Sequence, residues 1–400
     1  METLFFLPNW PPAATDLSWF GVMLLCAVVL GELGHSLLRL PRITGYVLAG
    51  VILSPGVAGF WSPEMLARMQ PFYDVAFGIV LFELGQRIDL GWLRRNPWLL
   101  ATSIAESLLA FAFVGALLML LDVPPLVSVL AAGLASATGP AVVLGVCGDT
   151  AARGQVTERL HLLCALSSCY SFVTLGVAYA WQHQAHASTL VVTALHPMYL
   201  IMGSIALGAA IAALMLALLA RMRPEQNGQT IGAIAVIIAT VAIVDEMQLS
   251  VVITLLVAGV LCRSLDKRRR MQPMDFGLIG RLALIVVFVS TGALLRPDDF
   301  VTAIVPALGL LAARALGKIV GVFVFARPSG LPMRKASLLS ISLLPMSGAA
   351  LLWVERTTAI WPELGSQLAA IVLTALVIME LLGPPALQFA LRRADETTRD

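Results

Sequence analysis

The chain carries an internal repeat whose two copies lie about 208 residues apart. Three short motifs recur in the same order, with offsets of 209, 207 and 209 residues: Ala49-Gly50 on Ala258-Gly259, Phe82-Glu83-Leu84-Gly85 on Val289-Ser290-Thr291-Gly292, and Thr138-Gly139-Pro140-Ala141 on Ser347-Gly348-Ala349. A near-constant offset across three anchors is not expected by chance. In a chain this hydrophobic it predicts a membrane bundle built from two copies of one unit.

The composition is that of a protein with many membrane spans. Hydrophobic residues make up 59% of the 400 residues, charged residues make up 12%, and the mean hydropathy is +0.89, outside the range of soluble domains. A membrane-spanning helix needs about 20 apolar residues. The sequence predicts an all-α protein with thirteen spans, at 18–38, 43–61, 72–90, 98–121, 125–147, 158–182, 190–220, 229–245, 249–264, 277–296, 299–326, 335–355 and 364–391.

Basic residues mark one side of these spans. Of the 26 Lys and Arg residues, 21 fall in the loops after odd-numbered spans and in the C-terminal tail, and three fall on the opposite side. Positive charge gathers in cytoplasmic loops. We therefore expect a cell inner or plasma membrane protein with an extracytoplasmic N-terminal tail (1–17) and a cytoplasmic C-terminal tail (392–400). The basic run at 267–270 is expected to lie against anionic lipid.

The repeat offset maps span 2 onto span 9, span 3 onto span 10 and span 5 onto span 12. Each shift is seven spans, and an odd shift turns the second copy upside down in the membrane. The sequence thus predicts one transporter domain over 18–391, with inverted repeats at about 18–182 and 229–391 and a connecting helix at 190–220. Such repeats place a substrate site near the middle of the membrane, between the two copies.

Two helices are expected to be discontinuous. Span 5 contains Thr138-Gly139-Pro140, and its duplicate, span 12, contains Pro345-Met346-Ser347-Gly348. Proline removes a backbone donor and glycine loosens the helix, so both spans are expected to break at mid-depth. Unwound backbone inside a bilayer is tolerated only where it is buried in protein or lines a cavity. The paired breaks therefore indicate a functional site, whose half-helix ends carry partial charges that can balance an ion.

Charged residues inside a membrane are costly and indicate function. Three of them form the predicted proton-coupling group, namely Glu106 on span 4, and Arg314 and Lys318, which share one face of span 11. The repeat offset relates position 106 to position 314. We therefore expect Glu106 and Arg314 to lie at equal depth on opposed helices and to pair or share a cavity.

Three further acids are Glu32, close to the end of its predicted span, Glu83, and Glu380, which precedes the run Gly383-Pro384-Pro385. Glu83 lies four residues before Arg87, a spacing that brings the two side chains together on a helix. Glu32 is expected to pair with a neighbouring arginine. All three are predicted to lie near the membrane surface.

Three motifs resemble those of the monovalent cation:proton antiporter superfamily, the sodium/hydrogen exchanger fold. The run LPRITGYVLAGVILSPG from Leu40 to Gly56 is similar to that family's signature LPRVLGYLLAGILLGP. The run ATGPAVV from Ala137 to Val143 is similar to its ATDPA or ATSPA motif, and ARALGK from Ala313 to Lys318 to its aRllGK helix. The resemblance covers roughly residues 18 to 390 and is to the Kef-type branch, without the cytoplasmic nucleotide-binding domain that some relatives append.

The resemblance implies a homodimer, in which a core domain holding two crossed, broken helices moves against a dimerisation domain. It also implies that ions and protons compete for carboxylates at the crossing. The chain departs from this pattern, because span 6 carries no acid between Leu163 and Phe172 and the family's Asp position in span 5 is Gly139. Hydroxyl groups and backbone carbonyls remain as candidate ion ligands, at Thr138, Gly139, Pro140, Ser167, Ser168, Ser171, Ser347 and Gly348.

These observations predict a secondary active antiporter that exchanges a monovalent cation such as Na⁺ or K⁺ for H⁺ by alternating access. Hydroxyl groups do not titrate near neutral pH, so Glu106 is the expected proton carrier. Two alternatives remain open. One is a transporter of organic anions or other solutes on the same fold, since Arg314 and Lys318 are retained, and the other is a sensor that has lost transport.

The sequence argues against an enzyme and against a cofactor. Ser347 lacks the leading glycine of a nucleophile elbow, and the chain has no phosphate-binding Gly-Lys-Ser/Thr loop. The five cysteines have neither disulfide nor metal-site spacing. A net charge of +2 gives no sign of nucleic acid as a partner. The expected partners are the monovalent cation, the proton, the lipid bilayer and a second copy of the chain.

Overall fold

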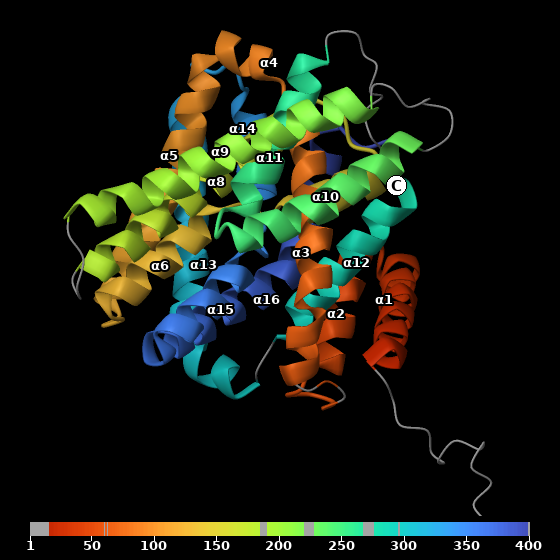
Figure 1. Ribbon diagram of the computed structural model, residues 1–400, viewed down its shortest axis with the longest axis vertical. Helices are drawn as coiled ribbons and strands as arrows, with labels where there is room; N and C mark the ends of the chain where they lie inside the picture. The colour runs from red at the N-terminus through yellow and green to blue at the C-terminus, as the bar shows by residue number, and fades with distance from the viewer. Residues whose placement is uncertain are drawn as a thin grey trace, which may run out of the picture.

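The protein is a bundle of α-helices in a computed structural model that describes residues 16–59, 61, 63–184, 190–219, 228–266, 276–294 and 297–398. Figure 1 shows α9 and α10 crossing the front of the molecule, with α5 on one side and α1 on the other. The described residues form sixteen helices: α1 (Asp16–Leu38), α2 (Arg42–Leu53), α3 (Pro63–Gln86), α4 (Leu90–Arg95), α5 (Pro97–Leu120), α6 (Pro125–Ser136), α7 (Pro140–Asp149), α8 (Gln155–Gln184), α9 (Leu190–Leu219), α10 (Gly228–Glu246), α11 (Val251–Leu265), α12 (Gly277–Ala293), α13 (Pro297–Ala326), α14 (Met333–Ser342), α15 (Ala350–Ile360) and α16 (Pro362–Arg393).

Each of the thirteen predicted spans is occupied by a helix or a pair of helices. Seven helices of the described chain are long and apolar enough to cross a membrane on their own, namely α1, α5, α8, α9, α10, α13 and α16. Four spans are formed by α2, α3, α11 and α12, and the remaining two by α6 with α7 and by α14 with α15. The all-α membrane bundle and its two discontinuous helices are therefore confirmed.

Two boundaries differ from the predicted spans by more than five residues. α2 ends at Leu53 because Ser54 adopts an extended conformation and starts a turn. α3 begins at Pro63, nine residues before the predicted start, and Pro71 lies inside it. The predicted N-terminal tail up to residue 15 and the basic run at 267–270 lie outside the described residues.

The helices form two groups that meet along one boundary. The core bundle contains α5, α6, α7, α8, α13, α14, α15 and α16, and the scaffold contains α1, α2, α3, α9, α10, α11 and α12. Within the core bundle α5 packs along α13, and within the scaffold α2 packs along α12 and α3 along α11. Across the boundary, α16 contacts α2, α7 contacts α3, and α8 contacts α9 and α11. Both broken helices lie in the core bundle.

The glycines of the sequence repeat lie at two matching helix crossings in the scaffold. Gly50 of α2 faces Gly292 of α12, and Gly85 of α3 faces Gly259 of α11. A Cβ atom at any of the four would overlap the backbone of the facing helix, so the close approach requires glycine. The repeat relates Gly50 to Gly259 and Gly85 to Gly292. The two crossings are therefore duplicates of each other.

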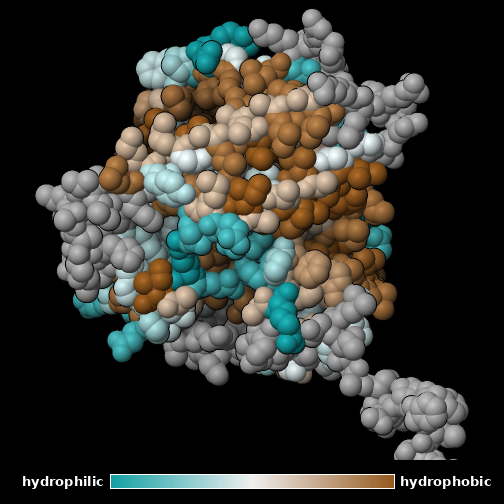
Figure 2. All heavy atoms as spheres, viewed as in Figure 1, coloured by the Kyte–Doolittle hydropathy of each residue, from teal (hydrophilic) through white to brown (hydrophobic). Residues whose placement is uncertain are grey.

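Hydrophobic side chains cover most of the visible face of the molecule, with hydrophilic side chains gathered in a patch on its lower half (Figure 2). Leu25, Leu120 and Leu278 are 66%, 78% and 74% exposed. An exposed apolar surface of this extent marks a protein that contacts something other than water. In a chain with this many apolar spans, that contact is the hydrocarbon of a bilayer.

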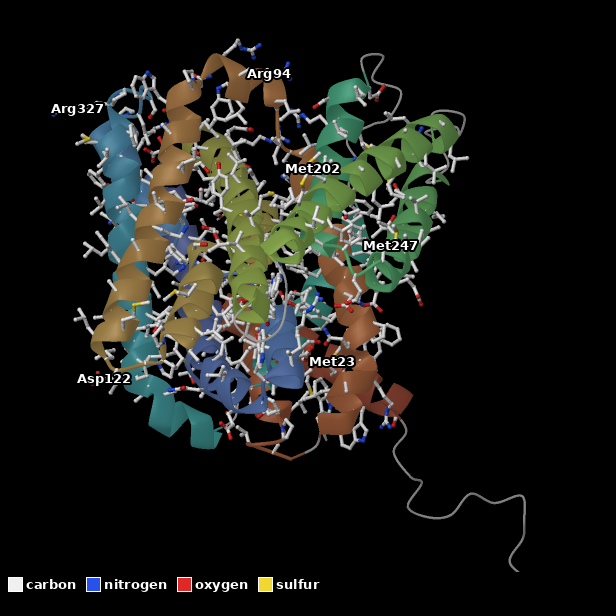
Figure 3. All side chains as sticks on the ribbon, turned by 60° about the vertical axis from the view of Figure 1, so that its left-hand side comes forward. Met23, Arg94, Asp122, Met202, Met247 and Arg327 are labelled. Carbon is white, nitrogen blue, oxygen red and sulfur yellow. The ribbon has the colours of Figure 1, made fainter. Side chains whose placement is uncertain are left out.

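One end of the bundle is basic and is tied together by the C-terminal segment. Arg94 and Arg327 lie at this basic end, and Asp122 lies at the opposite end (Figure 3). The carboxylate of Glu396 accepts hydrogen bonds from the backbone N–H groups of Val156 and Thr157, both 2.9 Å long, at the start of α8. Its backbone carbonyl accepts a further bond from the N–H of residue 153, 2.8 Å long. Glu396 thus caps a helix that begins 240 residues earlier in the chain.

The electrostatics of this cap set a pH dependence. Burial raises the pKa of Glu396, but the hydrogen bonds from Val156, Thr157 and Lys335 outweigh burial and hold the pKa below its usual value. A folded-state pKa below the unfolded one means that the carboxylate stabilises the fold above the unfolded pKa. This stabilisation is lost as the pH falls through the folded-state pKa.

We expect Glu396→Gln to lower the free energy of unfolding at pH 7 by roughly 1–3 kcal/mol, because it weakens charge-assisted bonds to a helix terminus. Thermal unfolding in detergent measures the effect. The difference from the wild type should shrink as the pH falls below about 4. Glu158→Gln, at an exposed acid in the first turn of α8, is the control and should have a smaller effect. Equal destabilisation by Glu396→Gln at pH 7 and at pH 3.5 would contradict this account.

Candidate functional site

The two broken helices meet at their breaks. The first break lies between Ser136, the last residue of α6, and Pro140, the first of α7; the second lies between α14 and α15. Thr138 and Met346 form an isolated antiparallel bridge, and the N–H of Gly139 donates to the carbonyl of Pro345 over 3.0 Å. Thr138 and Met346 are 208 residues apart, within one residue of the offset that relates Thr138 to Ser347, so the two breaks are corresponding segments of the repeat. The pseudo-two-fold axis therefore passes through this contact, which we call the crossing.

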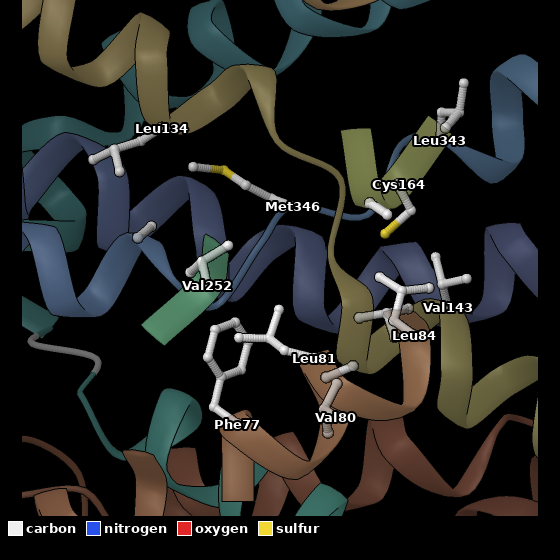
Figure 4. Packing of buried hydrophobic residues seen from close by; sticks show 14 of the residues in the cluster. Phe77, Val80, Leu81, Leu84, Leu134, Val143, Cys164, Val252, Leu343 and Met346 are labelled. Carbon is white, nitrogen blue, oxygen red and sulfur yellow. The ribbon is translucent and has the colours of Figure 1, made fainter. Parts of the chain in front are cut away.

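The chemistry of the breaks explains why they form. A Cβ atom at residue 139 would overlap the carbonyl oxygen of Met346, so glycine is required where the two breaks touch. Pro140 suits the first position of α7, where no backbone donor is needed. In Figure 4 the side chain of Met346 extends toward Leu134 of α6, while Leu343 lies beside Cys164 of α8. Apolar packing thus surrounds the unwound backbone.

Arg314 of α13 holds the two breaks together. Its side chain is 1% exposed. The guanidinium donates to five backbone carbonyls: Ala135 (2.6 Å), Ala137 (3.0 Å), Leu343 (3.2 Å), Pro345 (2.9 Å) and Leu344. These carbonyls end α6 and α14, where the helix dipoles place negative partial charge. One buried cation therefore satisfies carbonyls at the ends of both half-helices.

The expectation that Glu106 and Arg314 form a direct pair is wrong. Glu106 instead forms an ion pair with Lys318, and both side chains are fully buried. α5 and α13 are antiparallel, and Gly321 packs on the backbone of Glu106. Along α13, Lys318 lies about one turn from Gly321, the residue opposite Glu106, and Arg314 lies about two turns from it. Two residues related by a two-fold axis touch each other only if both lie close to the axis. The repeat offset relates Glu106 to Arg314 but does not say how far they lie from the axis.

The candidate hydroxyls all make hydrogen bonds to the backbone near the crossing. Ser167 accepts from the N–H of Thr138 over 3.1 Å and donates to the carbonyl of Cys164 over 3.0 Å. Ser168 donates to the same carbonyl over 2.9 Å, and Ser171 to that of residue 133 over 2.7 Å. The hydroxyl of Ser347 accepts from the N–H of residue 349 over 3.3 Å. Ser167 thus ties α8 to the first break and Ser171 ties α8 to α6, while Ser168 and Ser347 bond within their own segments.

Three of these hydroxyl groups line one cavity beside the crossing. Its walls include Ser168, Ser171 and Ser347, with Phe77 of α3 and Trp353 of α15. The free space is about what one water molecule needs. The lining residues carry no charge. Within the described residues, no three His, Cys, Asp or Glu side chains gather as metal ligands.

The remaining acids fall into two classes. Glu32 forms an exposed ion pair with Arg42 (2.9 Å), and Glu83 pairs with Arg87 (2.7 Å), as predicted for surface pairs. Glu380 does not lie near the surface, which corrects the prediction. It is 2% exposed, and its position lies about 4 Å from the midpoint of the 32-residue helix α16, at 1.5 Å per residue. The prediction took the Gly383-Pro384-Pro385 run as a sign of the membrane surface, although the predicted span 364–391 itself continues past both prolines, as α16 does.

Sequence reasoning also missed Tyr73. Its hydroxyl donates to the carbonyl of Gly348 over 2.8 Å, which links α3 of the scaffold to the second break. The predicted span began at residue 72, which placed Tyr73 at a membrane surface. Because α3 begins at Pro63, Tyr73 lies well inside the helix and is 1% exposed.

We expect Arg314→Lys to destabilise the protein by at least about 3 kcal/mol, because the ammonium has three donors in a compact group and loses two or more charged hydrogen bonds. Thermal unfolding in detergent measures the loss. Arg327→Lys, at an exposed position just after the end of α13, is the matched control and should be neutral. A neutral Arg314→Lys variant would show that the carbonyl cluster does not hold the breaks together.

For the buried pair, Glu106→Gln and Lys318→Met should each destabilise by about 3–5 kcal/mol, because each leaves one buried charge uncompensated. The double variant is expected to be more stable than either single variant. Thermal unfolding of all four proteins completes the double-mutant cycle. Additive losses in the double variant would mean that the two side chains do not interact.

Comparisons with known proteins agree with this architecture. Two solved structures of the sodium proton antiporter MjNhaP1 from Methanocaldococcus jannaschii share its fold. One, determined at pH 8, is 15% identical with a TM-score of 0.70 and covers 95% of this chain and 96% of that chain. The other, an electron microscopy map, is 16% identical with a TM-score of 0.71 and covers 97% and 100%.

A curated protein is also similar in sequence. The iron transporter MagA of Paramagnetospirillum magneticum is 25% identical over 398 residues, which cover 94% of this chain and 86% of that protein. The family profile described as sodium/hydrogen exchanger, transmembrane, matches residues 21–392. With the crossing of two broken helices in place, this match over nearly the whole chain shows that the protein belongs to the sodium/hydrogen exchanger family.

Proposed function

We propose that the protein is a secondary active antiporter that exchanges a monovalent cation such as Na⁺ or K⁺ for H⁺ by alternating access. The observation that carries the proposal is the fully buried ion pair of Glu106 and Lys318 in the bundle that also holds both breaks. A buried Lys–Glu pair can change its proton count without unfolding the bundle. It thereby supplies the titratable group that the hydroxyls at the crossing lack.

The pair couples proton and cation through charge. With Lys318 protonated, the negative charge of Glu106 is balanced inside the protein. When Lys318 releases its proton, Glu106 is left with an unbalanced charge in a medium of low dielectric, and a cation entering the bundle restores the balance. Arg314 keeps its charge throughout, because its donors are already bound to the carbonyls of both half-helices.

The cation has oxygen ligands near the crossing. The hydroxyls of Ser168, Ser171 and Ser347 line the cavity beside it, while Thr138, Gly139, Pro140, Ser167 and Gly348 shape the breaks. Hydroxyl and carbonyl oxygens are hard, neutral ligands that suit Na⁺ or K⁺. We propose that these groups replace part of the cation's hydration shell.

Access alternates when the core bundle moves against the scaffold. The boundary between them is crossed by few polar contacts, including Tyr73 to Gly348 and Arg356 to Gln248 (3.3 Å). Movement along this boundary would open the cavity beside the crossing first to one side and then to the other. The MjNhaP1 structures, titled as a sodium proton antiporter, support the same assignment for this fold.

We further propose that the protein lies in a cell's inner or plasma membrane with its basic end in the cytoplasm, since basic loops stay on that side. The N-terminus is then outside and the C-terminus inside. A homodimer formed through the scaffold would give the core bundle a fixed frame to move against.

Transport in proteoliposomes tests the function. A pH-sensitive dye inside the vesicles should report proton movement when Na⁺, K⁺ or Li⁺ is added, and Glu106→Gln should reduce the rate at least tenfold, because the coupling charge is removed. Glu32→Gln, at an exposed pair, is the matched control and should keep the rate. Flux carried by organic anions without cation dependence, flux of Fe²⁺ alone, or no flux of any solute would each overturn cation/proton antiport.

A further inference from the structure

Glu380 is a buried acid without a cation. It lies on α16 of the core bundle and is 2% exposed, and its Oε2 atom has no hydrogen-bond partner within the described residues. A buried carboxylate is normally paired or hydrogen-bonded, because an isolated ionised one is very costly. Glu106, by contrast, already has Lys318. Glu380 therefore has free capacity for a proton or a metal ion.

The repeat places Glu380 on the helix that corresponds to α8. Offsets of 207 to 209 residues relate residue 380 to residues 171–173, beside Ser171. α8 supplies hydroxyls to the cavity beside the crossing but no acid within it. The repeat thus relates a position beside the neutral Ser171 on α8 to the Glu380 carboxylate on α16. In the second copy of the repeated unit, an unpaired acid takes the place of a hydroxyl.

Glu380 lies close to the second break. One turn further along α16, a Cβ atom at Gly383 would meet Pro345 at 3.2 Å, so the helix packs directly on the unwound segment. Glu380 also lies within electrostatic range of Tyr73, whose hydroxyl is bound to the carbonyl of Gly348. The Glu380 carboxylate therefore lies near the second break, which the Tyr73 hydroxyl binds from the scaffold through the Gly348 carbonyl.

The helices packed against α16 leave this carboxylate uncompensated. The charged side chains that the structure describes on these helices are Arg42 of α2, Asp149 of α7, Arg281 of α12, Arg314 and Lys318 of α13, Arg334 and Lys335 of α14, and Glu355 and Arg356 of α15, with the ionisable Tyr46 of α2 and Cys147 of α7. Tyr73 of α3 also lies within electrostatic range of Glu380. Within the described residues, none of these groups forms a hydrogen bond or an ion pair with Glu380.

We propose that Glu380 is the carboxylate that binds the transported monovalent cation, in competition with a proton. When the cation binds, the O–H bond of the protonated carboxyl breaks and the proton leaves to water on the open side. When the cation leaves on the other side, a proton from water there takes its place on the same oxygen. One positive charge enters the site for each that leaves, so no further reactant is needed.

Acids near Tyr73 mark a route to the site. Asp74 of α3 and Glu355 of α15 both act electrostatically on Tyr73, as Glu380 does. Glu355 is exposed and Asp74 is half-buried. Negative charge along a path raises the local concentration of cations. The cation would thus reach Glu380 past Glu355 and Asp74, with Tyr73 next to the second break.

This proposal rests on the proposed function, but proton release in detergent tests it without transport. Purified wild-type protein in weak buffer should release protons when Na⁺, K⁺ or Li⁺ is added, with saturation at about one proton per bound cation at this site. Glu380→Gln should lose the proton of this site, so that only release from the Glu106–Lys318 pair can remain at the same cation concentration. Glu363→Gln, at an exposed acid in the first turn of the same helix, is the matched control and should release as the wild type does.

Further variants separate the possible outcomes. Glu380→Asp keeps the charge on a shorter side chain, so it should still release protons but need at least tenfold more cation. Glu380→Gln removes an unpaired buried charge and should melt no lower than the wild type, which excludes loss of fold as the cause. Unchanged proton release in Glu380→Gln, or none in the wild type with all three cations, would overturn the site. Proton release without exchange in proteoliposomes would overturn only the proposed antiport.

Discussion

The rest of the core bundle depends on the contact between one guanidinium and the ends of two half-helices. Arg314 donates to carbonyls from Ala135 to Ala137 in the first break and from Leu343 to Pro345 in the second. Without it, the negative ends of α6 and α14 would face each other inside a medium of low dielectric. Unwound backbone at membrane depth is stable only when such groups are satisfied. The bundle can therefore place flexible, polar chain at its centre only because this arginine is buried there.

The same arginine limits what the crossing can bind. Its planar fork of donors is occupied by carbonyls, so it has little capacity left for an anionic solute. A carboxylate or phosphate could bind only by displacing bonds that hold the breaks together. The geometry thus weakens the case for an anion transporter, although the sequence showed two cations on one helical face. Retention of a basic residue does not by itself indicate a site for an anion.

Much of the fold could be predicted from the sequence because it follows from local chemistry. Apolar length gave the thirteen spans, and proline with glycine gave the two breaks. The glycines of the repeat motifs lie where helices pack closely, Gly50 on Gly292 and Gly85 on Gly259. The pairing of Glu106 could not be predicted in this way, because it depends on the vertical register of α5 against α13. That register is set by the packing of Gly321 on Glu106 and of Gly317 on Ala110, which the repeat offset does not contain. The burial of Glu380 was missed because the Gly383-Pro384-Pro385 run after it was taken to mark the membrane surface, although α16, like the predicted span 364–391, continues past both prolines.

Charge balance inside the bundle gives a physical reason for coupling. Arg314 is balanced by helix ends and Lys318 by Glu106, whereas Glu380 is a buried acid without a cation among the described residues. An ionised, empty Glu380 would have to cross the low-dielectric boundary alone when the core bundle moves, at a cost of several kcal/mol. With either a proton or a monovalent cation bound, the site is neutral and moves at little cost. The core bundle then moves only with a proton bound or with a cation bound. Because it cannot return empty, it carries one ion inward for each ion that it carries outward. Obligatory exchange thus follows from the electrostatics of one unpaired carboxylate and needs no separate gate.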